Sequence, residues 1–229
     1  MSPRPDVRKG IAMTDVTSAV EAILGRREAV PRTRSVLTGI TGIDGSGKGY
    51  VTEHLAARLR ERGIRVAAIN VDGWLNLPSR RFGPVNPAEH FYDHAIRFEE
   101  LFARLILPLK ESRSCRLVAE LADATDAEVY RRHTYEFADV DVILLEGIFL
   151  LKRAHRHNLD LSFWIDCTFE TALERALARG QEGLSPEETV RDYETIYFPA
   201  QRIHLDRDSP RGFATAVVNN DPRIPAPAP

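Results

Sequence analysis

Cysteine is scarce in this chain of 229 residues, which contains only Cys115 and Cys167. Two cysteines do not make the disulfide framework of a small secreted domain, so we expect free thiols in a reducing cytoplasm. The sequence also lacks an apolar signal core near its N-terminus and any apolar run that approaches membrane-span length. These absences favour a cytoplasmic globular protein without a membrane partner.

An excess of charge of either sign is also missing, since 31 basic and 33 acidic residues leave a net charge of −2. Such a balance gives no attraction to nucleic acid or to an anionic membrane, and neither is expected as a partner. Lysine is rare, because only four of the 31 basic residues are lysine and the rest are arginine. One of the four, Lys48, lies in a glycine-rich segment, where a compact ammonium fits between phosphate groups better than a planar guanidinium.

The glycine-rich segment 42–49 has the pattern G-x-x-x-x-G-K of a phosphate-binding loop. It follows an apolar segment and precedes a helical pattern, which is the context that the motif requires. Glycines permit positive φ, so consecutive backbone N–H groups can point at an anion, and the helix N-terminus adds its dipole. We predict that this segment binds the phosphates of ATP through Gly42, Asp44, Gly45, Ser46, Gly47, Lys48, Gly49 and Tyr50.

Position 49 departs from the pattern, because glycine stands where serine or threonine normally gives an oxygen to Mg²⁺. Tyr50 and Thr52 are poor substitutes, the first for its rigid ring and the second for its distance along the helix. Two alternatives stay open. Either Mg²⁺ binds with a water in place of this ligand, as Mg²⁺ commonly allows, or the chain is a nucleotide-binding regulator with weak catalysis.

Five apolar segments alternate with helical patterns and predict an α/β fold with a doubly wound five-stranded parallel sheet and helices on both faces. The strands are expected at residues 35–41, 65–71, 141–145, 161–166 and 215–218. Helices are expected at 14–26, after the glycine-rich loop, at 86–107, at 169–179 and from 185 onward. Capping boxes are predicted at Asn86–Glu89 and Ser185–Glu188, and two extended arms at 116–121 and 128–135.

Acidic residues follow two of these predicted strands, Asp72 after 65–71 and Glu146 after 141–145. In an open parallel sheet ligands bind at the carboxyl ends of the strands. Two carboxylates beside a phosphate loop can divide metal binding and proton acceptance between them, as phosphoryl transfer requires. The alternative for Asp72 is a turn residue, since Asp-Gly is a common turn pair. We predict that both acids and Lys48 are catalytic and that both acids hold the metal.

Arginines form a third group of candidates. Arg175 and Arg179 are four residues apart on the predicted helix 169–179, and Arg191 lies on the next helix. The segment 180–184 between these helices predicts the flexible break of a closing lid, from which arginines can stabilise the moving phosphoryl group. The alternative is that an arginine-rich chain covers its solvated helix faces with them. We predict catalytic roles for Arg175 and Arg179 and acceptor binding for Arg191.

These features together resemble the uridine kinase and phosphoribulokinase group of phosphate-loop kinases over roughly residues 35–222. The resemblance implies ATP and Mg²⁺ as cofactors, a helical lid, and the strand at 141–145 beside the strand at 35–41. Residues 1–34 precede this region, and we expect them to be an extension with one helix at 14–26 and with 1–13 unstructured. We expect 223–229 to be a disordered tail. The carriers of the resemblance are Gly42–Lys48, Val71-Asp72, Phe91–His94 with Phe98, Val142–Ile148, the arginine helix and Val217–Pro222.

The resemblance also assigns roles. It implies that Asp72 is the base or a ligand of the acceptor hydroxyl, and that Glu146 organises Mg²⁺. It places Asp93 near the acceptor hydroxyls, and Asn220 and Pro222 near the ATP base.

The insert departs from the family, because residues 130–135 do not match the tyrosine and histidine spacing with which uridine kinases hold a pyrimidine. Tyr130, Arg132 and His133 are still predicted to face an acceptor. We expect an ATP-dependent, uridine kinase-like enzyme that phosphorylates a hydroxyl of a small nucleoside or sugar-containing metabolite. The open alternatives are a kinase for a sugar acid, sugar phosphate or vitamin precursor, and the regulator. Association into a homo-oligomer also stays open.

Overall fold

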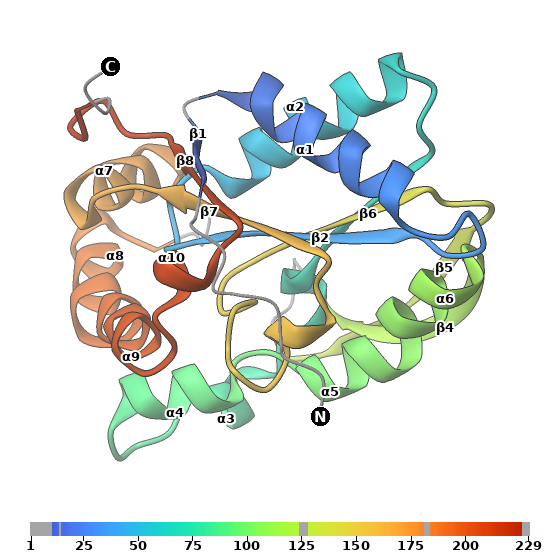
Figure 1. Ribbon diagram of the computed structural model, residues 1–229. Helices are drawn as coiled ribbons and strands as arrows, with labels where there is room; N and C mark the ends of the chain where they lie inside the picture. Colours follow the sequence, from blue (N-terminus) through green and yellow to red (C-terminus); the bar gives the residue numbers. More distant parts are fainter. Residues whose placement is uncertain (1–10, 14, 124–127, 181–183, 226–229) are drawn as a thin grey trace, which may run out of the picture.

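The computed structural model describes residues 11–13, 15–123, 128–180 and 184–225, and it has a parallel sheet with helices on both faces (Figure 1). The strand order is β1-β8-β7-β2-β6-β3. The predicted α/β fold is therefore confirmed, and β6 pairs with β2 as the resemblance implies. In sheet order the strands are β1 (Ile11–Met13), β8 (Ala216–Asn219), β7 (Leu161–Asp166), β2 (Val36–Gly42), β6 (Val142–Glu146) and β3 (Val66–Asn70).

One edge of the sheet differs from the expectation. Residues 11–13 were expected to be unstructured, but they form β1, which runs parallel to β8 with Ile11 opposite Ala216. Without β1, β8 would be an edge strand with unpaired N–H and C=O groups, which β1 pairs. The extension therefore adds a short sixth strand to the five that the sequence predicts.

The extension also contributes to the core. Its helix α1 (Val16–Ala29) starts at Asp15, whose side chain accepts from the Ser18 N–H, and it packs beside α2 (Lys48–Glu61) on one face of the sheet (Figure 1). Ala19, Val20 and Ile23 are buried in the same apolar cluster as β2 and α2. At the other end Arg223 pairs with Glu174 of α7 (Phe169–Arg179), whereas residues 226–229 of the predicted tail lie outside the described residues.

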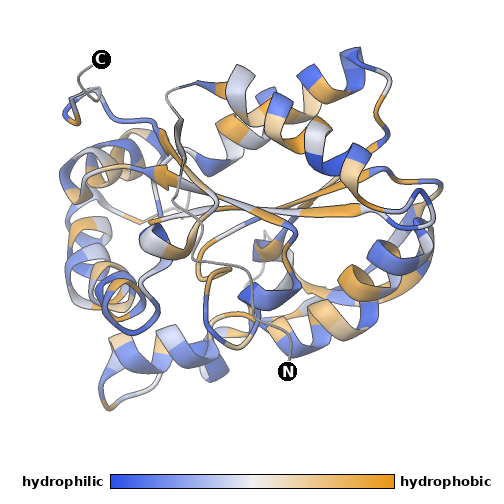
Figure 2. Cartoon of the chain, in the orientation of Figure 1, coloured by the Kyte–Doolittle hydropathy of each residue, from blue (hydrophilic) through white to orange (hydrophobic). Residues whose placement is uncertain are grey.

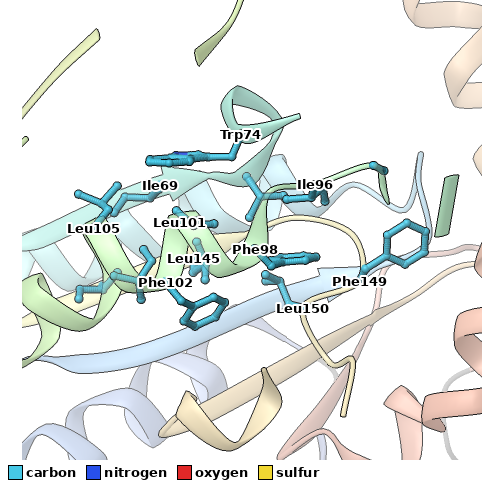
Figure 3. Packing of buried hydrophobic residues seen from close by; sticks show 14 of the residues in the cluster. Ile69, Trp74, Ile96, Phe98, Leu101, Phe102, Leu105, Leu145, Phe149 and Leu150 are labelled. Carbon is cyan, nitrogen blue, oxygen red and sulfur yellow. The ribbon is translucent and has the colours of Figure 1, made fainter. Parts of the chain in front are cut away.

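Burial explains the central strands. The four apolar residues of β6 are fully buried, because helices cover both faces of a parallel sheet. Figure 2 shows this hydrophobic centre, with the hydrophilic residues toward the outside. On the face opposite α1 and α2, a second cluster gathers Trp74, Ile96, Phe98 and Phe149 around the sheet (Figure 3).

The predicted helix at 86–107 is interrupted. It divides into α4 (Pro87–His94) and α5 (Phe98–Leu101), which a π-helical turn at Phe102–Ile106 joins to α6 (Leu107–Ser112). The backbone between α4 and α5 pairs with the loop after β3 instead, since Asn76 N–H donates to Ala95 O at 2.8 Å and Arg97 N–H to Trp74 O at 2.9 Å. This pairing fixes the β3 loop against α4 and α5.

The remaining elements follow the predicted order. The two extended arms are confirmed as β4 (Cys115–Ala122) and β5 (Tyr130–Phe137), a separate antiparallel pair. No helix in the described part of the chain is long and apolar enough to cross a bilayer. The other helices are α3 (Pro78–Arg81), α8 (Pro186–Asp192), α9 (Phe198–Asp208) and α10 (Pro210–Phe213), with a π-helical turn at Tyr193–Tyr197 between α8 and α9.

Candidate active site

The glycine-rich loop connects β2 to α2, as the motif requires. Gly45 and Gly47 have φ of +76° and +87°, which favour glycine. A Cβ on Gly45 would lie 2.5 Å from Ala172 O, and one on Gly47 would lie 2.2 Å from Asn220 Nδ2. The two glycines are therefore required both by the curl of the loop and by its close approach to α7 and to the segment after β8.

Two side chains hold the carbonyl groups of this loop. Asn220 Nδ2 donates to Ser46 O at 2.8 Å, and Arg175 Nη1 donates to the same oxygen at 3.1 Å. Arg175 also donates through Nη2 to Asn220 O at 2.8 Å. Arg175 is predicted to act on the phosphoryl group, but in the structure its guanidinium donates to carbonyl groups of the phosphate loop and of the segment after β8. Asn220 lies beside the loop, and Pro222 is exposed two residues further on.

Lys48 and Ser46 give the loop the donors that a phosphate needs. Lys48 is buried, and its ammonium donates to Ile43 O at 3.0 Å. No carboxylate in the described residues lies within 4 Å of it. Ser46 Oγ is also buried and has no hydrogen-bond partner there. A buried hydroxyl without a partner is costly, so this donor fits a loop that receives a phosphate oxygen.

The two predicted acids meet at the edge of the sheet. Glu146 is the last residue of β6, with Ile40 of β2 and Asn70 of β3 opposite it. Asp72 lies two residues beyond Asn70, whose side chain accepts from the Asp72 N–H at 2.7 Å. Gly42 lies two residues beyond Ile40, so the sheet brings both acids to the phosphate loop.

Electrostatics shows how closely these groups interact. Burial raises the pKa of Glu146 to about 7, with Lys48 opposing the rise and Asp72 and Asp44 adding to it. The pKa of Asp72 is also raised, chiefly because the surrounding protein desolvates its carboxyl, although the side chain keeps solvent contact. The positive charge of Arg179, an exposed residue at the end of α7, also opposes the rise in the pKa of both acids, and its predicted catalytic role stays a prediction.

These acids fit a Mg²⁺ ion, which prefers carboxylate oxygens and takes the place of the protons that they would otherwise hold. The described residues contain no group of three or more acidic, histidine or cysteine side chains that could hold a metal. A Mg²⁺ ion would therefore take its other ligands from water and from the phosphates, which is its usual practice beside a nucleotide.

The lid region is only partly described. Asp44 of the loop accepts a hydrogen bond from the Tyr193 hydroxyl between α8 and α9. Arg191 is exposed and pairs with its neighbour Asp192 at 3.2 Å, so the structure does not bring it to the site. The predicted break at 180–184 falls largely on residues 181–183, which lie outside the described residues. Tyr50 is 60% exposed, and its ring contacts that of His54 in a tilted arrangement.

The predicted acceptor residues separate into two groups. Asp93 lines a pocket of about 600 Å³. The Tyr130 hydroxyl lies 3.4 Å from Asn76 Oδ1, and its ring lies under the Arg97 guanidinium; Asn76 and Arg97 also line the pocket. Arg132 and His133 are not in its lining, since Arg132 is exposed on β5 and His133 packs against Tyr135.

Comparisons with solved structures show what this fold is similar to. A possible uridine kinase from Bacillus stearothermophilus shares 22% identity and a TM-score of 0.70, covering 89% of this chain and 96% of its own. A candidate fructose transport system kinase from Silicibacter sp. TM1040 shares 21% identity with a TM-score of 0.70, and the match covers 90% of this chain and 99% of that protein. D-glycerate 3-kinase from Cryptococcus neoformans shares 14% identity with a TM-score of 0.60, and the match covers 89% of this chain and 95% of that protein. The chain has the fold of a P-loop kinase.

The comparison with family models matches only one part of the chain. The family model described as methylmalonyl Co-A mutase-associated GTPase MeaB matches residues 13–79, which contain the phosphate loop and Asp72. No curated protein matches the chain. This match covers less than a third of the chain, whereas the likeness to the solved kinase structures extends over about nine-tenths of it.

We predict that the unfolding free energy of this protein depends on pH through the raised pKa of Glu146. Its pKa of about 7 lies above the usual 4.5, so the folded chain binds this proton more tightly than the unfolded chain. The stability from the group is complete below pH 4.5 and is lost as the pH rises through 7. Glu146→Gln should therefore exceed the parent in unfolding free energy by about 1–3 kcal/mol at pH 8 and by little at pH 5.

Urea unfolding at both pH values measures this effect, with the exposed Glu61→Gln as control. Equal differences at pH 5 and pH 8 would contradict the raised pKa. The same substitution should weaken Mg²⁺-dependent nucleotide binding in calorimetry, because it removes a carboxylate ligand.

We predict that position 49 tolerates a side chain larger than that of glycine. A Cβ at Gly49 would meet nothing within 4 Å, and serine has a better helix propensity than glycine. We therefore expect Gly49→Ser to unfold at the same or a slightly higher temperature, and to need less Mg²⁺ for half-maximal turnover. A large loss of activity in a folded Gly49→Ser protein would show that the open space at 49 is itself used.

Proposed function

We propose that this chain is an ATP-dependent kinase that transfers the γ-phosphate to a hydroxyl of a small metabolite, with uridine kinase-like chemistry. One observation carries the proposal. The phosphate loop follows β2, Asp72 follows β3, and Glu146 ends β6 between these two strands, while a pocket of acceptor size is bounded by the loops after β3 and β6. The kinase fold of the whole chain supports it.

The residues divide the work as phosphoryl transfer requires. Lys48 and the loop N–H groups bind and orient the phosphates, and Arg179 adds positive charge beside the acids. Asp72 takes the proton of the acceptor hydroxyl as its oxygen bonds to the γ-phosphorus and the bond to ADP breaks. Glu146 would hold Mg²⁺, which when bound neutralises charge on the phosphates.

A GTP-hydrolysing protein is the second candidate, and the match of residues 13–79 to the MeaB GTPase model favours it. Against it stands the acceptor-sized pocket that Asp93 lines, which a hydrolase does not need. The two candidates differ in what stimulates turnover, namely a hydroxyl compound for the kinase and a protein partner or nothing for the GTPase.

The decisive experiment measures nucleotide turnover with ATP and with GTP, alone and with nucleosides, sugars, sugar acids, sugar phosphates and vitamin precursors. A kinase should prefer one acceptor, which should raise ADP formation well above the rate with water, since an enzyme that closes on its correct acceptor limits hydrolysis. GTP turnover that no acceptor stimulates would favour the second candidate. We further propose a cytoplasmic location for the enzyme.

A further inference from the structure

The pocket that Asp93 lines also contains the side chain of Lys152, which is not among the predicted site residues. The loop after β3, the end of α4, the start of α5 and the segment after β6 form this pocket. Its volume of about 600 Å³ suits a small metabolite. Its lining includes Asn76, Arg80, Asp93, Ile96, Lys152 and His155.

Lys152 lies six residues beyond Glu146 and shares two properties with the phosphate-loop lysine. Its ammonium donates to a main-chain carbonyl, that of Tyr92, and lies 3.8 Å from the centre of the Tyr92 ring. No carboxylate in the described part of the chain lies within 4 Å of it. Lys110 differs, because Asp160 lies 3.4 Å from its ammonium.

The surroundings leave this charge poorly compensated. Burial lowers the pKa of Lys152 to about 8, with Asp93 and Asp208 opposing and Arg207 adding to the fall. Asp208 accepts bonds from the Tyr92 hydroxyl and His204, each at 2.7 Å, so its carboxylate is shared with other donors. A partly desolvated ammonium is costly unless an opposite charge pairs with it.

The other charged groups of the pocket have different roles. Arg97 donates to Glu100 at 2.6 Å, and Glu100 also pairs with Arg104 at 2.6 Å, so these three side chains form one ion-pair network. Arg80 and Asp93 are exposed and have no side-chain hydrogen bond or ion pair in the described residues. Ile96 and Phe98 supply an apolar wall from the core cluster in Figure 3. A ligand that satisfies this pocket brings an anion for Lys152 and hydroxyls for Asp93.

We propose that the acceptor carries an anionic group, a carboxylate or a phosphate, and that Lys152 binds this group while Asp93 receives the acceptor hydroxyls. The inference rests on the proposed kinase function and narrows its substrate class to phosphorylated or acidic polyols. Lys152 is then a specificity-determining residue, set on the loop after β6 in the same way that Lys48 is set on the loop after β2.

Matched acceptor trios test the proposal with the full chain and ATP. Each trio has a neutral, a carboxylate and a phosphate member, such as glycerol, glycerate and glycerol 3-phosphate, or ribose, ribonate and ribose 5-phosphate. An anionic member should be phosphorylated with a KM at least about 10-fold below that of the neutral member. Its identity distinguishes a carboxylate from a phosphate.

Variants of Lys152 give the second readout. Lys152→Met should raise the KM for the anionic acceptor by about 10- to 100-fold, as expected for a lost charge pair, with a smaller change in kcat. Lys152→Arg should restore part of the loss, and Arg58→Met, an exposed cation on α2, should change nothing. A neutral acceptor that is preferred, and that Lys152→Met does not affect, would overturn the inference and leave the kinase assignment intact.

The pH profile separates binding from a structural role. The KM of the parent should rise above pH 8 as Lys152 loses its proton, whereas Lys152→Arg should show no such rise. Asp93, Arg207, Asp208, His155, His204 and Tyr92 face Lys152 as charged or titratable groups. The pKa of Tyr92 is raised by burial and that of His204 is lowered by burial, so neither titrates near pH 8. The pKa values of Asp208 and His155 are lowered, so both have finished titrating at pH 8.

Direct binding completes the test without turnover. The chain has four lysines, so ¹³C-lysine labelling gives four side-chain signals, which single substitutions assign. The anionic trio members should raise the pKa of Lys152, and the neutral members should not. If no anion shifts this signal the inference is wrong, and if in addition no acceptor stimulates ATP turnover the proposed function is wrong as well.

Discussion

Lys48→Ala should reduce nucleotide turnover about 10²- to 10³-fold, the usual cost of removing one preorganised charge-stabilising donor. The lysine is buried, and among the described residues its ammonium donates to Ile43 O alone, which leaves it able to bind a phosphate as proposed. The unfolding free energy should change by no more than about 1 kcal/mol. Steady-state kinetics and urea unfolding measure the two effects.

Lys110→Ala is a matched control with the opposite pattern. Its ammonium donates to Asn158 O at 2.7 Å and pairs with Asp160, so its loss should lower stability and leave kcat close to that of the parent. If Lys48→Ala kept full turnover, the phosphate-loop assignment would be wrong whatever its stability.

Asp72→Asn should lower kcat about 10²- to 10⁴-fold, because it removes the group that accepts the hydroxyl proton. The phosphate loop is untouched, so calorimetry should give a Kd for the nucleotide within a few-fold of the parent value. The exposed Asp206→Asn on α9 is the control. Loss of nucleotide binding together with unchanged single-turnover chemistry would exchange the roles of Asp72 and Glu146.

The substitution has a second expected consequence. Asp72 helps to raise the pKa of Glu146, so Asp72→Asn should move the loss of stability between pH 5 and pH 8 toward lower pH. This shift reports the spacing of the two acids independently of catalysis.

The sequence predicted the features that local patterns determine. The glycine loop, the continuous apolar run of β6 and the acids at the strand ends all follow from short-range rules, and the structure confirms the elements that carry them. The Ser185–Glu188 capping box is confirmed too, because Ser185 Oγ accepts from the Glu188 N–H at 3.2 Å and Glu188 accepts from the Ser185 N–H at 2.9 Å.

Predictions that depend on distant partners were weaker. Asn86 was predicted to open a capping box, but its φ is +49° and its side chain donates to the Glu89 carboxylate at 2.6 Å instead. Arg175 was predicted on the phosphoryl group because its helix spacing looked right, yet its partners are carbonyls about 130 and 45 residues away. No local pattern contains such contacts.

The sequence contains one indication that Lys152 has a special role. Its rarity in an arginine-rich chain is visible in the sequence, as for Lys48, but no glycine motif surrounds it. Its meaning depends on Tyr92 and Asp93 of α4, about 60 residues earlier, and on the fact that no carboxylate of the described residues lies within 4 Å of its ammonium. Only the fold brings these groups together.

The paired backbone between residues 74–76 and 95–97 has a consequence for substrate selection. The segment that carries Asp72, the proposed base, continues directly into one wall of the pocket, and two backbone hydrogen bonds tie this segment to Ala95 and Arg97. Contacts made far from the reacting hydroxyl can therefore set the alignment of the base. Shortened acceptor analogues would then turn over slowly even at saturation, because remote binding energy is used for alignment rather than for affinity.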